Sequence, residues 1–345
     1  MEEIYSKLDQ ISNLENHYLV KARNSSDNYF KEFIKSAKII KGILSESEFE
    51  SWCSDKMFLK QRTFVEKSFI QYAVETAVVS YFCEKFPNDF KADAEIKPNS
   101  KKDVDCQFQD NGFKFNVEVK CSDFDSKEKI EKEKGIKYET VGRLDDRGQK
   151  TMDTISSALD EVFAKRGEQK MSHLRGRNMD NNLKDFLESA HNKFDPNPKE
   201  NEVNILLVGC DNERDIQNWF NYLWAEKGLF TNQSFEDNDH YNNVDLVVFT
   251  NLYFKQNKFF DKKVNNCWTL DKSFNLIYSN PNRLLQKNTG ISHFKELFPN
   301  YTEELNNYIS SGDVATDVKG AVKIPHFIQE ILEGQQDLYL FNKKE

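Results

Sequence analysis

Three residues of this chain, Asp105, Glu118 and Lys120, have the chemical types that metal-assisted hydrolysis needs. Carboxylate oxygens bind hard divalent cations, and a neighbouring ammonium group can orient a water molecule or stabilise negative charge on a phosphoryl oxygen. This chemistry requires that the three side chains, which are separated in the sequence, meet in space. The segment that carries them must therefore fold back on itself.

Residues 103–121 have the pattern of a β-hairpin. Apolar and polar side chains alternate on both sides of a central Asp-Asn-Gly, whose residues tolerate tight-turn conformations. Since successive side chains of a strand point to opposite faces, Glu118 and Lys120 lie on the same face. The polar face of the first strand carries Asp103 and Asp105, so at least one aspartate can approach Glu118 and Lys120.

A second carboxylate source lies upstream of the hairpin. Residues 64–86 are apolar at helical spacing, which predicts a largely buried helix. Glu75 falls in the most apolar part of this segment. A buried carboxylate is costly unless a partner or a metal ion satisfies it, so Glu75 either joins the site or pairs within a structural network.

The remaining apolar segments predict an α/β order of elements. Residues 89–97 alternate like a strand, and residues 149–165 repeat apolar side chains at helical spacing. Residues 204–210 and 244–250 are short continuous apolar runs, the pattern of strands that are buried on both faces. Together with the hairpin, these segments give the order helix, three strands, helix, strand.

Asp105, Glu118 and Lys120, with the hairpin between them, resemble the motif of the PD-(D/E)XK nuclease superfamily. In that family an acidic residue on one strand is followed, after a hairpin, by Glu-x-Lys on the next. The proline of the family name is absent here, and Asp103 competes with Asp105 for the metal role. The family often carries a glutamate on its first helix, for which Glu75 is the candidate ahead of Glu66.

The resemblance implies a restriction-endonuclease-like mixed β-sheet core of order α-β-β-β-α-β, flanked by helices. It implies a metal-dependent nuclease, most simply a DNA endonuclease of the restriction or phage-defence kind that uses Mg²⁺, with Mn²⁺ as a substitute. Asp105, Glu118, Glu75 and the peptide carbonyl of Val119 would hold the ion, with Lys120 beside the scissile bond. The implied partners are double-stranded DNA and either a second copy of the chain or another protein of a defence system.

Two alternatives remain open from the residues alone. The hairpin can be an ordinary amphipathic one with a solvated charged face, in which case the chain is an inactive nuclease-like binding or scaffold module. The same scaffold can also serve a structure-selective nuclease that acts on DNA or RNA.

Composition limits the possible classes of protein. The 345 residues carry a net charge of -9, so a nucleic-acid contact has to be a local basic patch. The six cysteines are scattered without a Cys-x-x-Cys pair, which disfavours a zinc site or a disulfide framework and favours a reducing compartment. The start of the chain lacks a secretion signal, and no apolar run of about 18 residues occurs. These features predict a cytoplasmic protein that does not contact membranes.

The predicted organisation has three parts. Residues 1–60 form a helical N-terminal cap, residues 61–250 form the nuclease-like core, and residues 251–345 form a mixed strand and helical C-terminal extension packed on the core. Within the last part, residues 253–263 interleave aromatic and lysine side chains. This segment is expected to be an edge strand or loop whose rings pack inward, although such interleaving can also stack bases and neutralise phosphates.

Overall fold

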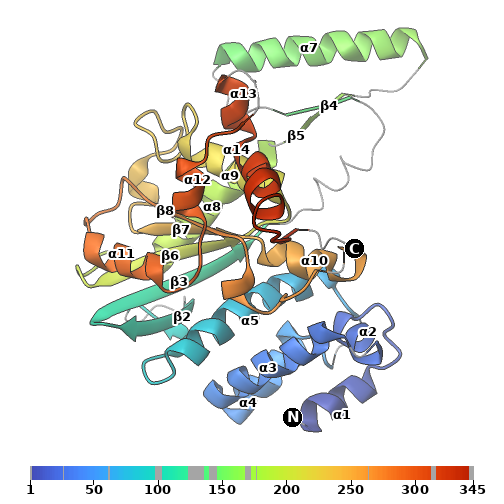
Figure 1. Cartoon of the computed structure of the whole chain (residues 1–345), viewed down its shortest axis with the longest axis vertical. Helices are drawn as coiled ribbons and strands as arrows, with labels where there is room; N and C mark the ends of the chain where they lie inside the picture. Colours follow the sequence, from blue (N-terminus) through green and yellow to red (C-terminus); the bar gives the residue numbers. More distant parts are fainter. Residues whose placement is uncertain are drawn as a thin grey trace.

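The computed structural model describes residues 2–25, 27–60, 63–97, 103–122, 136–139, 146–167, 172–175, 177–262, 264–311 and 316–341. Its centre is a six-stranded mixed sheet of order β1-β2-β3-β6-β7-β8, shown in Figure 1. The strands of this sheet are β1 Lys91–Glu95, β2 Asp103–Asp110, β3 Phe113–Cys121, β6 Glu202–Gly209, β7 Leu246–Thr250 and β8 Asn275–Ser279. A second sheet consists of β4 Ile136–Glu139 and β5 Ser172–Arg175.

The six-stranded sheet contains both strand orientations. Strands β1, β2 and β3 are antiparallel, β6 and β7 run parallel to β3, and β8 returns antiparallel to β7. All residues of β6 and β7 are buried, as expected for central strands that are covered on both faces. The carboxyl ends of β3, β6 and β7 therefore meet at one edge of the sheet.

Helices surround this sheet. The helices in the first part of the chain are α1 Glu2–Gln10, α2 Tyr18–Asn24, α3 Asn28–Ile43, α4 Glu46–Ser51, η1 Trp52–Lys56 and α5 Glu66–Lys85. Those in the middle are α7 Asp146–Lys165, α8 Arg177–Lys193, α9 Glu213–Trp224, η2 Asn238–His240, α10 Leu252–Lys262 and η3 Leu270–Lys272. Those near the end are α11 Asn288–Glu296, α12 Thr302–Asn307, α13 Thr316–Ala321, α14 Lys323–Phe327 and η4 Ile328–Glu333.

The sheet separates two helical layers. On one face, α5 packs on β2 and β3, where Phe82 stacks on Phe108 at 4.5 Å between ring centroids. The other face is covered by α8 and α9, whose Trp219 ring lies 6.3 Å from the ring of Phe249 on β7. The N-terminal helices α1 to α4 lie on the outer side of α5 (Figure 1). Within the described ranges, no helix is long and apolar enough to cross a membrane.

The structure confirms most of the predicted elements. The buried helix is α5, the first strand is β1, and the hairpin consists of β2 and β3 with Asn111 and Gly112 both at positive φ in the turn. The helix predicted at 149–165 is α7, and the two apolar runs are β6 and β7. The chain is thus mixed α/β, with a mixed sheet flanked by helices, as expected.

Two features differ from the sequence-based expectation. Residues 253–263 were expected to be an edge strand or loop, but residues 252–262 form the helix α10, because Tyr253, Gln256 and Phe259 recur at helical spacing and are buried. Helix α8 was not expected, although Leu183, Leu187, Ala190 and Phe194 repeat at the same spacing and are buried.

Candidate active site

The candidate site lies where β2 and β3 part. The paired residues of these strands run from Asp110↔Phe113 to Cys106↔Val117. Beyond that point, Oδ2 of Asp105 accepts a hydrogen bond from the backbone N–H of Val119 at 2.6 Å. The carboxylate of Asp105 is therefore held against the backbone of β3 between Glu118 and Lys120. The contact places Asp105 against the strand that carries Glu118 and Lys120, whose convergence with Asp105 was predicted from strand alternation.

Asp105 belongs to a group of three carboxylates. Oxygen atoms of Glu75 on α5, Asp93 on β1 and Asp105 on β2 all lie within 4.8 Å of one another. The backbone of Asp93 has φ 42°, a left-handed conformation that aspartate tolerates better than most residues. A cavity of about 20 Å³, room for a single water molecule or ion, is lined by these three side chains, by Lys56 and by mostly apolar residues of α3, η1, α5 and β1.

The environment of these carboxylates disfavours their charged forms. Burial raises the pKa of Asp105 well above its usual value, and the negative charges of Glu75 and Glu118 raise it further. Burial also raises the pKa of Glu75, although the ammonium of Lys56 acts in the opposite direction. A divalent cation would remove this penalty because it stabilises ionised oxygens.

Lys56, at the end of η1, supplies positive charge to the group. Its Nζ lies 2.5 Å from Oε1 of Glu75 and 3.9 Å from an oxygen of Asp93. Burial acts to lower the pKa of Lys56, but Glu75 and Asp93 raise it above the usual value. The N-terminal helices therefore contribute directly to this site.

Glu118 forms a second cluster beside the first. It is fully buried, and its Oε1 lies 2.5 Å from Nζ of Lys120 and 2.7 Å from Nζ of Lys193, which closes α8. Lys193 also donates to Oε2 of Glu118 at 2.8 Å. Among the residues that the structure describes, Glu118 is not part of the three-carboxylate group. The two clusters are nevertheless electrostatically coupled, since Glu118 raises the pKa of Asp105.

The lysine of the predicted motif is held by the same network. Burial acts to lower the pKa of Lys120, but contact with Glu118 and the charge of Asp105 raise it above its usual value. These interactions favour the charged ammonium form of Lys120, which can neutralise a phosphate.

The structure separates the competing sequence candidates. Asp103, the first residue of β2, is exposed and pairs with Glu95 of β1, whereas Asp105 belongs to the carboxylate group. Glu66 accepts a hydrogen bond from the Tyr18 hydroxyl at 2.6 Å, away from Glu75 along α5. Val119 contributes its N–H to Asp105. These positions favour Asp105 over Asp103 and Glu75 over Glu66.

Sequence reasoning missed Asp93, Lys56 and Lys193. Asp93 lies in the predicted first strand, whose alternation placed it on a polar face without linking it to the hairpin. Lys193 lies at the end of α8, a helix that was not expected. Lys56 precedes α5 and comes close only because the N-terminal helices pack on that helix. The sequence feature that could have indicated this group is the presence of a carboxylate residue in each of the segments that form β1, β2 and α5.

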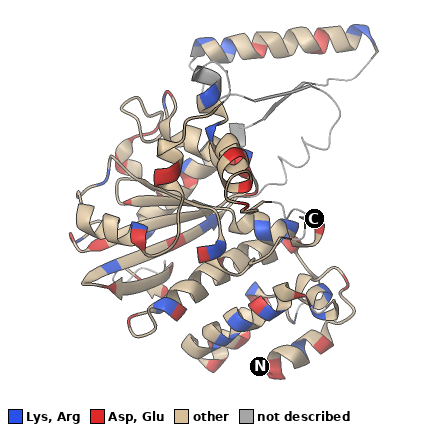
Figure 2. Cartoon of the chain, viewed as in Figure 1, with Lys and Arg blue, Asp and Glu red and all other residues tan. Residues whose placement is uncertain are grey.

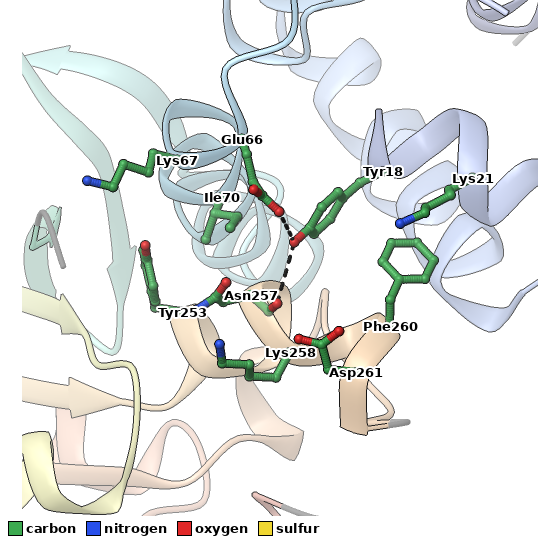
Figure 3. A pocket seen from close by; sticks show the side chains of 10 residues that line it. All are labelled: Tyr18, Lys21, Glu66, Lys67, Ile70, Tyr253, Asn257, Lys258, Phe260 and Asp261. Carbon is green, nitrogen blue, oxygen red and sulfur yellow. Dashed lines mark hydrogen bonds between the residues drawn. The ribbon is translucent and has the colours of Figure 1, made fainter. Parts of the chain in front are cut away.

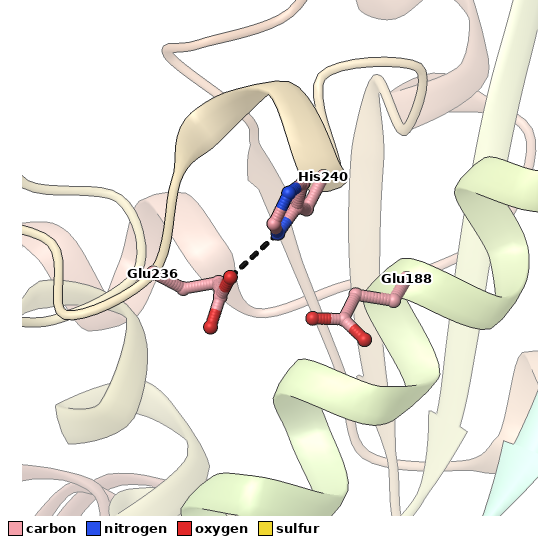
Figure 4. Close-up of side chains that lie close together, drawn as sticks. All are labelled: Glu188, Glu236 and His240. Atoms are coloured by element: carbon pink, nitrogen blue, oxygen red, sulfur yellow. Dashed lines mark hydrogen bonds and ion pairs between the residues drawn. The ribbon is translucent and has the colours of Figure 1, made fainter.

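A different group of possible ligands lies near η2. Glu188 on α8, Glu236 and His240 place ligand atoms within 4.8 Å of one another (Figure 4). Nδ1 of His240 lies 2.5 Å from Oε1 of Glu236, and Lys184 pairs with Glu188 at 3.1 Å. These surface contacts account for the geometry of the group.

Comparisons of the chain with protein-family models, with curated proteins and with solved structures found no match.

Proposed function

We propose that this chain is a metal-dependent nuclease that hydrolyses phosphodiester bonds, with a restriction-endonuclease-like core and, most simply, DNA as its substrate. One observation carries the proposal. Asp105, Glu75 and Asp93 come from three different elements and place their oxygens within 4.8 Å of one another, beside the Glu-x-Lys strand. Three carboxylate oxygens suit a hard cation such as Mg²⁺ or Mn²⁺.

The order of elements supports the same proposal. Helix α5, strands β1, β2 and β3, helix α7 and strand β6 occur in this sequence, with β6 parallel to β3, and β4, β5 and α8 are additional elements between β3 and β6. The resemblance named for the motif implies this order for the superfamily core. Motif and element order are independent features, because one concerns three side chains and the other concerns the whole sheet.

The residues divide the proposed work. Asp105, Glu75 and Asp93 would hold the ion, and Glu118 is a further carboxylate whose charge acts on Asp105. The peptide carbonyl of Val119 remains a proposed ligand on the strength of the resemblance. When bound, the ion supplies Lewis-acid charge and lowers the pKa of a coordinated water molecule.

The lysines act on the phosphate. Glu118 holds the ammonium groups of Lys120 and Lys193 at 2.5 and 2.7 Å. Pre-positioned cations stabilise the negative charge that develops on the phosphoryl oxygens without having to reorganise during the reaction.

A cleavage assay tests the proposal. Plasmid DNA and oligonucleotides, supplied as single strands, duplexes, branched DNA and RNA, are incubated with Mg²⁺ or Mn²⁺ and the wild type, Asp105→Asn, Lys120→Met or Asp103→Asn. Asp103 lies on the same strand as Asp105 but outside the cluster, so it is the matched control. We expect cleavage by the wild type and the control, and a loss on the order of 100-fold or more in the other two. Equal cleavage by all four proteins would reject the assigned site.

One observation favours a second function. Lys56 already pairs with Glu75, and Lys120 and Lys193 already pair with Glu118, so the clusters are partly neutralised without an ion. This arrangement is also what an inactive nuclease-like binding module would retain. Nucleic-acid binding without cleavage under any metal condition would identify that alternative.

A further inference from the structure

A cavity of about 280 Å³ lies between the N-terminal helices and the core. Its walls come from α2, from the first turns of α5 and from α10 (Figure 3). Each of these elements contributes one lysine, namely Lys21, Lys67 and Lys258. Cationic side chains from three separate parts of the chain therefore line a single hollow.

The lining combines charge with aromatic rings. Nζ of Lys21 lies 4.8 Å from the centre of the Phe260 ring, a cation–π contact that restrains the lysine. The carboxylates of the lining are Glu66 and Asp261, and Glu66 is held by the Tyr18 hydroxyl at 2.6 Å. Lysines thus outnumber carboxylates at the cavity. Ammonium groups beside aromatic rings are what proteins use to hold nucleic-acid phosphates and bases.

Two structural features relate the position of this cavity to that of the candidate active site. Lys67 and Glu75 lie on the same helix, and eight residues of helix span about 12 Å, or roughly three to four nucleotides along a B-form strand. At the sheet edge, a Cβ placed on Gly209 would lie 2.8 Å from Sγ of Cys121 and 3.2 Å from Cβ of Tyr253. Tyr253 lines the cavity, so the cavity reaches the carboxyl end of β6 beside Cys121, on the α5 side of the sheet.

We propose that this cavity is a phosphate-binding subsite, which holds the nucleic-acid strand a few nucleotides from the scissile bond. The inference rests on the proposed nuclease function and adds to it. The N-terminal helices become part of the substrate surface through Lys21, and α10 contributes through Lys258. The chain is acidic overall, and both signs of charge are interspersed along the N-terminal helices (Figure 2), so such a local lysine cluster is where phosphate contacts can concentrate.

Binding of a labelled oligonucleotide, measured by fluorescence anisotropy in EDTA over a series of salt concentrations, tests the subsite without cleavage. The variant is Lys21→Gln/Lys67→Gln/Lys258→Gln. Its control is Lys38→Gln/Lys199→Gln/Lys272→Gln, three exposed lysines outside the cavity. We expect the cavity variant to lose at least about tenfold in affinity. We expect the negative slope of log K against log salt to become shallower by about two to three. The single variant Lys258→Gln should lower the slope by about one.

The outcomes separate the subsite from the proposed function. Unchanged affinity and slope in the cavity variant, or an equal loss in the control, would overturn the subsite even if the wild type cleaves DNA. The proposed function fails separately, if Asp105→Asn cleaves as well as the wild type, and the binding result then still stands for the cavity. A wild type that binds no oligonucleotide in EDTA rejects the subsite, and the cleavage assay then decides the proposed function on its own. Thermal unfolding of the variants is compared first, so that a folding defect is recognised.

Discussion

The carboxylate of Asp105 takes the place of a backbone acceptor at the point where β2 leaves β3, since its Oδ2 accepts the Val119 N–H at 2.6 Å. A side chain that bonds to its neighbour's backbone is fixed more tightly than one that points into solvent. This contact holds the Asp105 carboxylate in a group with Glu75 and Asp93, and the charge of Glu118 also acts on it. The positions of the surrounding residues lead to the predictions below.

Replacing Asp105 with Asn should separate stability from function. Asparagine keeps an oxygen that can accept the Val119 N–H but removes a buried negative charge that Glu75 and Glu118 repel. We expect the free energy of unfolding in metal-free buffer to stay unchanged or to rise by about 1 kcal/mol, while metal-dependent activity is lost. Urea denaturation measures the first quantity. A variant that is clearly less stable than the wild type would show that the charge itself holds the fold together.

The contribution of Asp105 and Glu75 to the stability of the metal-free protein should fall as pH rises. The pKa values of Asp105 and Glu75 are raised in the folded state, by burial and, for Asp105, by neighbouring carboxylates. Between the unfolded pKa, about 4, and the raised folded pKa, the folded state binds more protons, so the free energy of unfolding decreases with pH across this window. The stability that these raised pKa values contribute is fully present only below the unfolded pKa.

Mg²⁺ should reverse this trend, because it binds the ionised carboxylates. We expect the increase in melting temperature caused by Mg²⁺ to grow with pH in the wild type and to be lost in Asp105→Asn. Thermal denaturation measures the Mg²⁺-induced rise in melting temperature in both proteins. The pH series runs from about 4.5 to about 8, roughly the range in which carboxylates with raised pKa values titrate. The same Mg²⁺ effect in the wild type and Asp105→Asn would contradict the assignment.

Lys56→Met should destabilise the metal-free protein but favour the ion. The change leaves the mostly buried Glu75 without its ammonium partner at 2.5 Å, at an expected cost of about 1–3 kcal/mol. Because a competing cation is gone, Mg²⁺ should stabilise this variant more than it stabilises the wild type. Lys35→Met, which breaks the exposed pair with Glu84, is the control and should cost less than about 1 kcal/mol. Equal costs for the two variants would contradict the account.

The losses in the free energy of unfolding that result from replacing Lys120 and Lys193, which share Glu118, should be non-additive. Lys120→Met or Lys193→Met alone leaves the buried carboxylate with one ammonium partner, whereas the double variant leaves it with neither. We expect the double variant to lose about 1–3 kcal/mol more than the sum of the single losses. A double-mutant cycle by chemical denaturation measures this difference. A strictly additive result would mean that the two lysines do not share Glu118.

Local patterns in the sequence were sufficient to predict the helices and strands but insufficient to predict which side chains from different elements contact one another. Alternation and an Asn-Gly turn predicted the hairpin, and apolar spacing predicted α5 with Glu75 on it. Asp93 could not be linked to Asp105, because that contact depends on how β1 pairs with β2 and on a left-handed residue in β1. Tertiary packing decides such contacts.

Two further differences have the same origin. The segment that forms α10 was expected to be an edge strand or loop with its rings packed inward, but three buried side chains at helical spacing decide its conformation. Lys193 was missed because α8 has many polar residues that hide its apolar stripe. Local composition is a weak guide where a helix buries only one narrow side.

Counting bound Mn²⁺ ions by electron paramagnetic resonance tests the central claim most directly, since that claim is a cation site built on Asp105. Mn²⁺ is titrated into the wild type, Asp105→Asn, Asp93→Asn and the exposed control Asp103→Asn. We expect the wild type and the control to bind Mn²⁺ in the same way, and affinity to fall by about 10-fold or more in the other two. Mn²⁺ binding that is equal in the wild type and Asp105→Asn, or absent from the wild type, would contradict the account.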